Sequence, residues 1–207
     1  MDHRGDIAHF TMVDQHTDPS FFVHFLDTGS TVADIQQVRQ MMRAQLALHD
    51  GLRVLDVGCG TGEALLPLPQ MVSPHGHVVG VDRSGTMIAE ATRRHAPTRL
   101  PVTFLVGDAH HLAFAAATFD RCRTERTLLH LDDPTRALAE LVRVVRPGGH
   151  VVVFDFDWDV TFIDHPDTQR TRWPCQLNEK SLPAAFIVRK AEGIEVKKIE
   201  VIVQEEN

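Results

Sequence analysis

Residues 53–63 read RVLDVGCGTGE: an apolar run that carries Asp56, followed by three glycines at alternate positions. The apolar run predicts a buried β-strand, and the glycines predict a sharp turn at which the backbone can approach a ligand closely. In open α/β sheets, ligands bind beyond the carboxyl ends of the strands. The stretch therefore predicts an α/β fold with a nucleotide-like ligand at this turn.

The spacing of the glycines and the charges beside them narrow the ligand. A dinucleotide fingerprint reads G-x-G-x-x-G and a P-loop ends in G-K-[ST], but here Glu63 stands at the position of the third dinucleotide glycine. Asp56 and Glu63 bracket the turn with negative charge, a poor setting for a pyrophosphate, which prefers amide donors. S-adenosylmethionine carries a sulfonium and an ammonium group and no phosphate, so it would gain from these carboxylates.

Short β-rich runs alternate with helical patterns after residue 50, which predicts a doubly wound, mostly parallel sheet with helices on both faces. The expected strands are 53–57, 77–82, 102–108, 119–125 and 150–157, and the expected helices are 31–49, 84–95 and 134–145. Asp133 is the expected N-cap of the last helix, and RPGG (146–149) is its expected stop. Pro67 and Pro69 predict that the helix after the glycine turn ends near Leu66.

Acidic residues end successive predicted strands. Asp82 lies 24 residues after Gly58, where a carboxylate can accept hydrogen bonds from both hydroxyls of a ribose. Asp108 ends the third strand and is placed for an adenine amino group, with the Ala109 amide beside it. In the fourth strand, Arg123 is charged where a central strand should be apolar, and a structural ion pair is its simplest explanation.

Four stretches of the chain resemble the successive motifs of class I S-adenosylmethionine-dependent methyltransferases: VLDVGCGTGE, VVGVDRSGTMIAEA, VGDAHHLAFAAATFD and ALAELVRVVRPGGHVVV. The resemblance covers about residues 35–157 and is strongest to the small-molecule branch that includes ubiquinone/menaquinone-biosynthesis methyltransferases. It implies a Rossmann-like sheet of seven strands with a terminal antiparallel hairpin. The function it implies is methyl transfer from S-adenosylmethionine.

The resemblance also implies a role for each motif residue. It places the methionine part of the cofactor over the glycine turn, the ribose on Asp82, and the adenine between Arg83 or Met87 and the Asp108–Ala109 turn. Thr124 and Glu125 match positions that face the amino-acid end of the cofactor. The expected cofactor-binding residues are Asp56, Gly58, Cys59, Gly60, Gly62, Asp82, Arg83, Met87, Asp108, Ala109, Thr124 and Glu125.

Methyl transfer from a sulfonium needs a general base only if the acceptor must lose a proton. His130, which follows the fourth predicted strand, is the first candidate for a catalytic residue, ahead of His110 and His111. A structural role is the alternative for each of these histidines. The histidine spacings match no zinc motif with cysteines, so the sequence predicts no metal site.

The sequence divides into three expected segments: an N-terminal lid or helical segment (1–50), an S-adenosylmethionine-binding core (51–160) and a C-terminal segment (161–207) that completes the sheet. Phe21, Phe22 and Phe25 would form the apolar face of the lid. The C-terminal segment contains all four lysines of the chain and fits the family's order and spacing poorly. Its terminal strands are therefore expected to be atypical, and the acceptor pocket could be incomplete.

The overall composition limits the partners. A net charge of -7 argues against nucleic acid or an anionic membrane as the main partner, and the resemblance implies a small-molecule methyl acceptor. The chain has 207 residues, no apolar stretch of the roughly 20 residues that span a bilayer, and no signal-peptide pattern at its start. Together with three cysteines that have no paired spacing, these features predict a soluble, cytoplasmic protein. A homodimer remains open beside a monomer.

Three functions remain open at this point. The first is methyl transfer to a small, apolar or aromatic acceptor at oxygen, nitrogen or carbon, by in-line displacement. The second is a methyltransferase-like module that binds the cofactor but is catalytically impaired. The third, a nicotinamide-dependent dehydrogenase, is disfavoured by Glu63 and by the glycine spacing.

Overall fold

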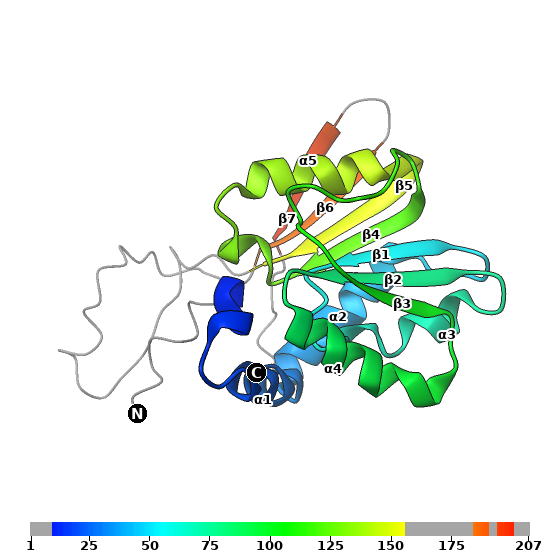
Figure 1. Ribbon diagram of the computed structural model, residues 1–207. Helices are drawn as coiled ribbons and strands as arrows, with labels where there is room; N and C mark the ends of the chain where they lie inside the picture. The colour runs from blue at the N-terminus through cyan, green and yellow to red at the C-terminus, as the bar shows by residue number, and fades with distance from the viewer. Residues whose placement is uncertain (1–9, 156–183, 191–193, 201–207) are drawn as a thin grey trace, which may run out of the picture.

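A twisted sheet forms the centre of the molecule, and its strands lie side by side in Figure 1. The computed structural model describes residues 10–155, 184–190 and 194–200. Its helices and strands, in chain order, are α1 (Ser20–Ser30), α2 (Ala33–Leu46), β1 (Arg53–Val57), η2 (Glu63–Leu65), α3 (Leu68–Val72), β2 (His77–Asp82), α4 (Gly85–His95), η3 (Ala96–Thr98), β3 (Val102–Val106), β4 (Phe119–Glu125), η4 (Leu128–His130), α5 (Pro134–Val144), β5 (Val145–Phe154), β6 (Ala184–Lys190) and β7 (Ile194–Glu200).

Five parallel strands lie in the order β3-β2-β1-β4-β5. The chain moves outward from β1 to β2 and β3, then returns to the other side of β1 with β4, so the strand order reverses between β1 and β4. In this register Asp56 on β1 lies beside Arg123 on β4. The predicted doubly wound, mostly parallel, Rossmann-like sheet is confirmed by these strands. The backbone of β6 pairs antiparallel with β5, and β7 pairs antiparallel with β6.

Helices cover both faces of the sheet, as predicted (Figure 1). On one face α5 packs over a cluster that includes Leu55 and Val153, and on the other α2, α3 and α4 pack over Val54 and Val152. Neighbouring residues of one strand thus serve opposite faces, because side chains alternate along a strand. Asp133 caps α5 as expected, with its carboxylate accepting a hydrogen bond from the backbone of Arg136 at 2.9 Å.

Four boundaries differ from the sequence prediction. After the glycine turn the helix does end at Leu65, but a second short helix, α3, begins beyond Pro67 and holds Pro69 in its first turn, where its missing N–H is tolerated. RPGG does not separate helix from strand, since β5 begins directly at Val145 and runs through it. A Cβ on Gly149 would lie 2.6 Å from the carbonyl oxygen of Asp120, so glycine lets β5 approach its neighbour there.

The other two differences are in strand and helix length. The third strand ends at Val106 rather than at residue 108, and the first long helix begins at Ala33 and ends at Leu46. Residues 156–183, where the predicted C-terminal segment begins, lie outside the described residues. Within the described residues, no helix has the length and apolar character needed to cross a membrane.

Candidate functional site

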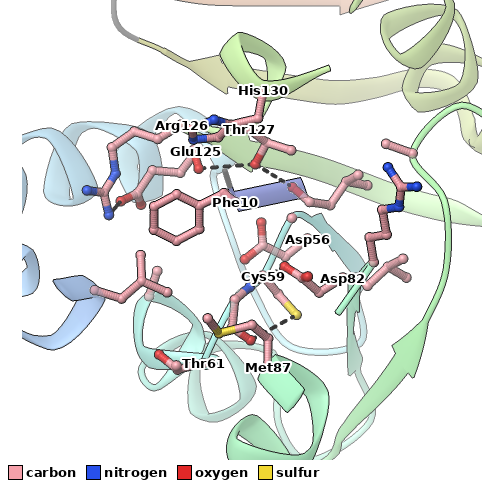
Figure 2. Close-up of a pocket in the computed structure, with 18 of the residues that line it drawn as sticks. Phe10, Asp56, Cys59, Thr61, Asp82, Met87, Glu125, Arg126, Thr127 and His130 are labelled. Atoms are coloured by element: carbon pink, nitrogen blue, oxygen red, sulfur yellow. Dashed lines mark hydrogen bonds and ion pairs between the residues drawn. The ribbon is translucent and has the colours of Figure 1, made fainter. Parts of the chain in front are cut away.

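A cavity of about 660 Å³ lies at the carboxyl ends of β1, β2 and β4 (Figure 2). This is the point at which the strand order reverses, where open α/β sheets bind their ligands. Ten of the twelve predicted cofactor residues line it: Asp56, Gly58, Cys59, Gly60, Asp82, Arg83, Met87, Asp108, Ala109 and Glu125. The candidate base His130 lines it as well.

The glycine turn is held against β2 by backbone hydrogen bonds. Gly58 and Cys59 both donate from their backbone N–H groups to the carbonyl of Val81, at 2.7 and 3.0 Å. Gly58 has a φ of +77°, and a Cβ there would lie 2.0 Å from Oγ1 of Thr127. Only glycine satisfies both the left-handed backbone and the close approach of the loop after β4.

Asp82 organises the next part of the cavity. Its Oδ2 accepts a hydrogen bond from the Gly60 amide at 2.8 Å, and its Oδ1 accepts one from the Ser84 amide at 2.9 Å. Burial raises the pKa of this carboxyl above its usual value. The two oxygens of an ionised carboxylate have about four acceptor positions between them, so these bonds leave Asp82 with acceptor capacity for a hydroxyl group of a ligand.

Asp108 lies at the opposite wall, beside Ala109. Its Oδ1 accepts from the backbone N–H of His110 at 2.9 Å and lies 2.8 Å from Nδ1 of the same histidine. The backbone hydrogen bond from His110 is the main cause that lowers the pKa of Asp108, so the carboxylate is ionised at neutral pH. Its other oxygen has no such partner among these bonds and is available to an amino group of a ligand.

A network of charged side chains forms the floor of the cavity. Arg123 is completely buried, with Nη2 2.6 Å from Oε2 of Glu125 and Nε 3.4 Å from Oδ1 of Asp56. The structural ion pair predicted for Arg123 is therefore confirmed. From α2, Arg39 donates from Nε to both oxygens of Glu125, at 3.0 and 3.1 Å, and its Nη1 contacts Glu63.

This network corrects one sequence-based expectation. Asp56 and Glu63 were expected to surround the turn with negative charge, but each already contacts an arginine, Arg123 and Arg39 respectively. Burial raises the pKa of Asp56 to about 6, against the opposing charge of Arg123. The attraction for a cationic ligand is thus smaller than the sequence alone implies.

The cavity nonetheless fits S-adenosylmethionine. The turn places glycine backbone, without side chains, along the wall. Oδ1 of Asp56 is buried and lies 3.4 Å from Nε of Arg123, without a hydrogen bond within the described residues. Asp56 also lines the cavity, where a carboxylate is suited to an ammonium donor of a ligand, and Asp82 offers acceptors to hydroxyl groups.

Two of the twelve predicted cofactor residues do not line the cavity. Gly62 has a φ of +73°, and its carbonyl oxygen lies 2.9 Å from Nε2 of the buried His95, which packs the turn against α4. Thr124 is inside β4 and only 1% exposed. Both residues support the cavity wall from behind.

Several cavity residues were not predicted from the sequence: Phe10, Thr11, Arg39, Thr61, Arg126, Thr127, Leu129 and Leu131. Arg39 left a detectable pattern, because it lies four positions after Ile35 on the buried face of α2, where a charge is out of place. Arg126 has a φ of +55°, a left-handed backbone conformation that is uncommon for arginine and cannot be predicted from the residue type.

The three candidate histidines are separated by the structure. His130 lies in η4 with its ring centroid 5.1 Å from that of Phe10, which points into the cavity (Figure 2). Burial, together with the charge of Arg126, lowers the pKa of His130, so its ring is neutral at pH 7. His110 also lines the cavity but is engaged with Asp108, whereas His111 contacts Arg136.

Comparisons with known proteins identify the class of this site. Residues 55–153 match the family model described as a methyltransferase domain. A ubiquinone/menaquinone biosynthesis C-methyltransferase of Bdellovibrio bacteriovorus is 31% identical over 134 residues, which cover 63% of this chain and 56% of that protein. An S-adenosylmethionine-dependent methyltransferase structure from Aquifex aeolicus aligns with a TM-score of 0.55 and 26% identity, over 63% of this chain and 70% of that one.

These matches agree with the described sheet, its reversal point and its glycine turn. The chain carries a class I methyltransferase domain, and the cofactor of this class is S-adenosylmethionine. The predicted resemblance to class I S-adenosylmethionine-dependent methyltransferases is confirmed, and the alternative of a nicotinamide-dependent dehydrogenase is set aside.

A further relative is longer than this chain. An uncharacterised 37.1 kDa protein in transposon TN4556 of Streptomyces fradiae is 40% identical over 151 residues, covering 72% of this chain and 43% of that protein. The chain thus spans about half the length of the curated relatives it matches.

Proposed function

We propose that this chain transfers a methyl group from S-adenosylmethionine to a small-molecule acceptor by in-line displacement. The observation that carries the proposal is the cavity of about 660 Å³, which joins a polar part at the glycine turn to an apolar part at Phe10 and Leu129. Its size is within the range of small-molecule sites, and one cavity with two chemical characters suits two reactants that must meet.

The polar part would hold the cofactor, which supplies an electrophilic methyl group on a positively charged sulfur. Asp82 would accept the ribose hydroxyls, and Asp108 with the Ala109 amide would bind the adenine. The glycine turn would admit the methionine part, with its ammonium group near the carboxylate of Asp56. These assignments are supported by the side chains that line each wall and by their remaining hydrogen-bond capacity.

The apolar part would hold the acceptor. Phe10, Phe25 and Leu131 give it walls that exclude water, and His130 is the neutral base that lines it. When the acceptor must lose a proton, His130 would accept it and so free the electron pair with which the acceptor takes the methyl group. The cofactor would supply that methyl group, and its sulfur would keep the electrons of the broken carbon–sulfur bond. Oxygen, nitrogen and carbon acceptors all fit this arrangement.

We extend the proposal to the whole chain. The N-terminal segment (1–50) would act as a lid, residues 51–160 as the cofactor core, and residues 161–207 as the segment that completes a seven-stranded sheet with β6 and β7. The net charge of -7 supports a small molecule, rather than nucleic acid or a membrane surface, as the partner. The protein would work in the cytoplasm, as a monomer or a homodimer.

Isothermal titration with S-adenosylmethionine and S-adenosylhomocysteine tests the cofactor assignment. We expect both to bind wild type, and Asp82→Asn to weaken both about tenfold or more because the ribose loses a charged acceptor. Asp133→Asn is the matched control, since Asp133 caps α5 and does not line the cavity. Absence of binding at millimolar cofactor would overturn the proposal.

One observation favours a second candidate, a module that binds the cofactor without turnover. Asp56, Glu63 and Glu125 each contact an arginine, which leaves less negative charge for a cationic ligand. Incubation with S-adenosylmethionine and a panel of phenols, quinols and amines, read by mass spectrometry, separates the two. A methylated product supports the transferase, and cofactor binding without any product supports the alternative.

A further inference from the structure

The N-terminal segment 10–15 forms a 3-10 turn that lies along the cavity and contacts both of its parts. Phe10, Thr11 and Val13 contribute to the lining. Val13 is 2% exposed and packs with Phe22 and Met87, so the middle of the segment is fixed to α1 and α4. Its two ends make contacts of different kinds.

One end of the segment is held by Asp14. Its Oδ1 accepts hydrogen bonds from Oγ of Ser84 at 2.6 Å and from the amide of Thr86 at 3.1 Å, and its Oδ2 accepts one from the amide of Gly85 at 2.7 Å. Although burial opposes ionisation, the hydrogen bonds from Ser84 and Thr86 lower the pKa of Asp14 to about 2. At neutral pH the bonds are therefore charge-assisted, which makes them stronger than neutral ones.

Ser84 connects this contact to the cofactor part of the cavity. It is the N-cap of α4, with Oγ accepting from the amide of Met87 at 3.2 Å. Its own amide donates to Asp82, whose other oxygen accepts from Gly60. Asp14 and Asp82 thus bind the same residue, and Asp14 is one hydrogen-bonded residue away from the proposed ribose contact.

The other end of the segment carries Phe10, which reaches the acceptor part. The Phe10 ring centroid lies 5.1 Å from that of His130, 5.1 Å from that of Phe22 and 5.8 Å from that of Phe25. Figure 2 shows the ring projecting into the cavity below Glu125. Because Phe10 and Asp14 belong to one short 3-10 helix, the anchorage of Asp14 restricts where the Phe10 ring can lie.

We infer that Asp14 is a positioning residue: its hydrogen bonds to the start of α4 hold Phe10 against His130 and tie the acceptor wall to the cofactor part of the cavity. Nothing in the sequence motifs of the domain assigns Asp14 a role. The connection to the cofactor rests on the proposed function, whereas the hold on Phe10 does not. The two statements are therefore tested separately.

Nuclear magnetic resonance of the His130 ring protons tests the hold on Phe10 without any ligand. Phe10→Leu removes the ring current of Phe10 and defines the resulting shift of the His130 signal. We expect Asp14→Ala to move the signal in the same direction and by at least half as much. Asp18→Ala is the control, because Asp18 belongs to the same N-terminal stretch but binds Ser20 at the start of α1.

An unchanged His130 signal in folded Asp14→Ala would overturn the inference. If that variant does not fold, Ser84→Ala serves instead, since it removes one donor to Asp14 and leaves the Asp14 carboxylate in place. The His130 signal must then shift in the direction set by Phe10→Leu, and a signal at the wild-type position would count against Asp14.

The dissociation rate of S-adenosylhomocysteine tests the connection to the cofactor. We expect this rate to rise about tenfold in Asp14→Ala and to stay at the wild-type value in Asp18→Ala. In Asp14→Ala/Ser84→Ala the combined effect should be smaller than the sum of the two, because both substitutions break the Asp14–Ser84 contact, whereas the bonds of Asp14 to Gly85 and Thr86 and of Ser84 to Met87 are not shared. If S-adenosylhomocysteine dissociates from Asp14→Ala at the wild-type rate, Asp14 does not influence the cofactor part of the cavity. If wild type fails to bind the ligand at all, the proposed function fails, and the His130 signal still decides the role of Asp14.

Discussion

Arg39 on α2 shares its single Nε–H between both carboxylate oxygens of Glu125 at the end of β4, at 3.0 and 3.1 Å, across a separation of 86 positions in the chain. Both side chains are 5% exposed, and the same guanidinium also contacts Glu63 next to the glycine turn. The pair therefore fixes the N-terminal helices over the strand ends. Although burial opposes it, the charges of Arg123 and Arg39 lower the pKa of Glu125, so the contact is ionic at neutral pH.

Arg39→Ala should lower the free energy of unfolding by about 1.5–3 kcal/mol, the usual range for losing a hydrogen bond to a charged group, because Glu125 keeps its contact with Arg123. Urea denaturation measures this directly. Arg93→Ala is the control, since the Arg93 side chain is 72% exposed and its pairing with Glu90 should contribute little. Equal unfolding midpoints for the two variants would mean that the buried pair adds nothing to stability.

Gly58→Ala and Gly148→Ala separate backbone strain from steric overlap. The two glycines have nearly the same φ, +77° and +76°, but a Cβ at Gly148 meets nothing within 4 Å, whereas one at Gly58 overlaps Thr127. Gly148→Ala should therefore cost only the strain of a left-handed alanine, about 1–2 kcal/mol. Gly58→Ala should cost clearly more and also displace the loop after β4.

Thermal unfolding of both variants gives the comparison. Thr127→Ala in the Gly58→Ala background should recover part of the difference, because the overlapping atoms Oγ1 and Cγ2 are removed. Similar losses in Gly58→Ala and Gly148→Ala would show that the turn relaxes around the added Cβ.

The sequence alone was sufficient to predict the parallel sheet and the edge of it at which the site lies. The period of the apolar residues and the glycine turn are local properties, and they placed β1, β2 and β4 at the observed residues. Acids at strand ends follow from the same logic, because parallel strands bring their carboxyl ends to one edge. Asp82 and Asp108 accordingly line the cavity, as predicted.

Local sequence patterns could not predict which charged side chains of the site are paired with one another. Whether Asp56 and Glu63 are free or paired depends on Arg123 and Arg39, and Arg39 comes from a helix outside the sheet. Asp14 is a similar case: its partners are the first residues of α4, about 70 positions later, and no local pattern connects them. Such long-range polar contacts depend on the packed structure rather than on periodicity.

Asp56 should make stability depend on pH between about 4 and 6. Burial raises its pKa from 3.8 to about 6 on folding, so the folded protein holds the proton more tightly than the unfolded chain. The stabilising contribution is fully present below about pH 4 and is lost as the pH rises through about 6. The shift of the Asp56 pKa between the unfolded and the folded protein corresponds to about 3 kcal/mol in the free energy of unfolding.

Asp56→Asn removes this titration. Urea denaturation of wild type and variant at several pH values gives the difference between them, in which the contributions of other groups cancel. The variant should gain stability relative to wild type from pH 4 to pH 7. A difference that is constant over this range would show that Asp56 has a normal pKa in the folded protein.

His130 should determine the lower limb of the pH–rate profile for any acceptor that loses a proton on methylation. Burial and the charge of Arg126 lower its pKa in the folded protein, so the rate should fall only below the usual range of histidine, as the ring becomes protonated and can no longer accept a proton. His130→Gln should lower kcat by about 10²–10⁴ and abolish this limb. His111→Gln is the matched control, because His111 contacts Arg136 and does not line the cavity. A wild-type profile in His130→Gln would leave His130 with a packing role against Phe10, and deprotonation of the acceptor would then fall to solvent.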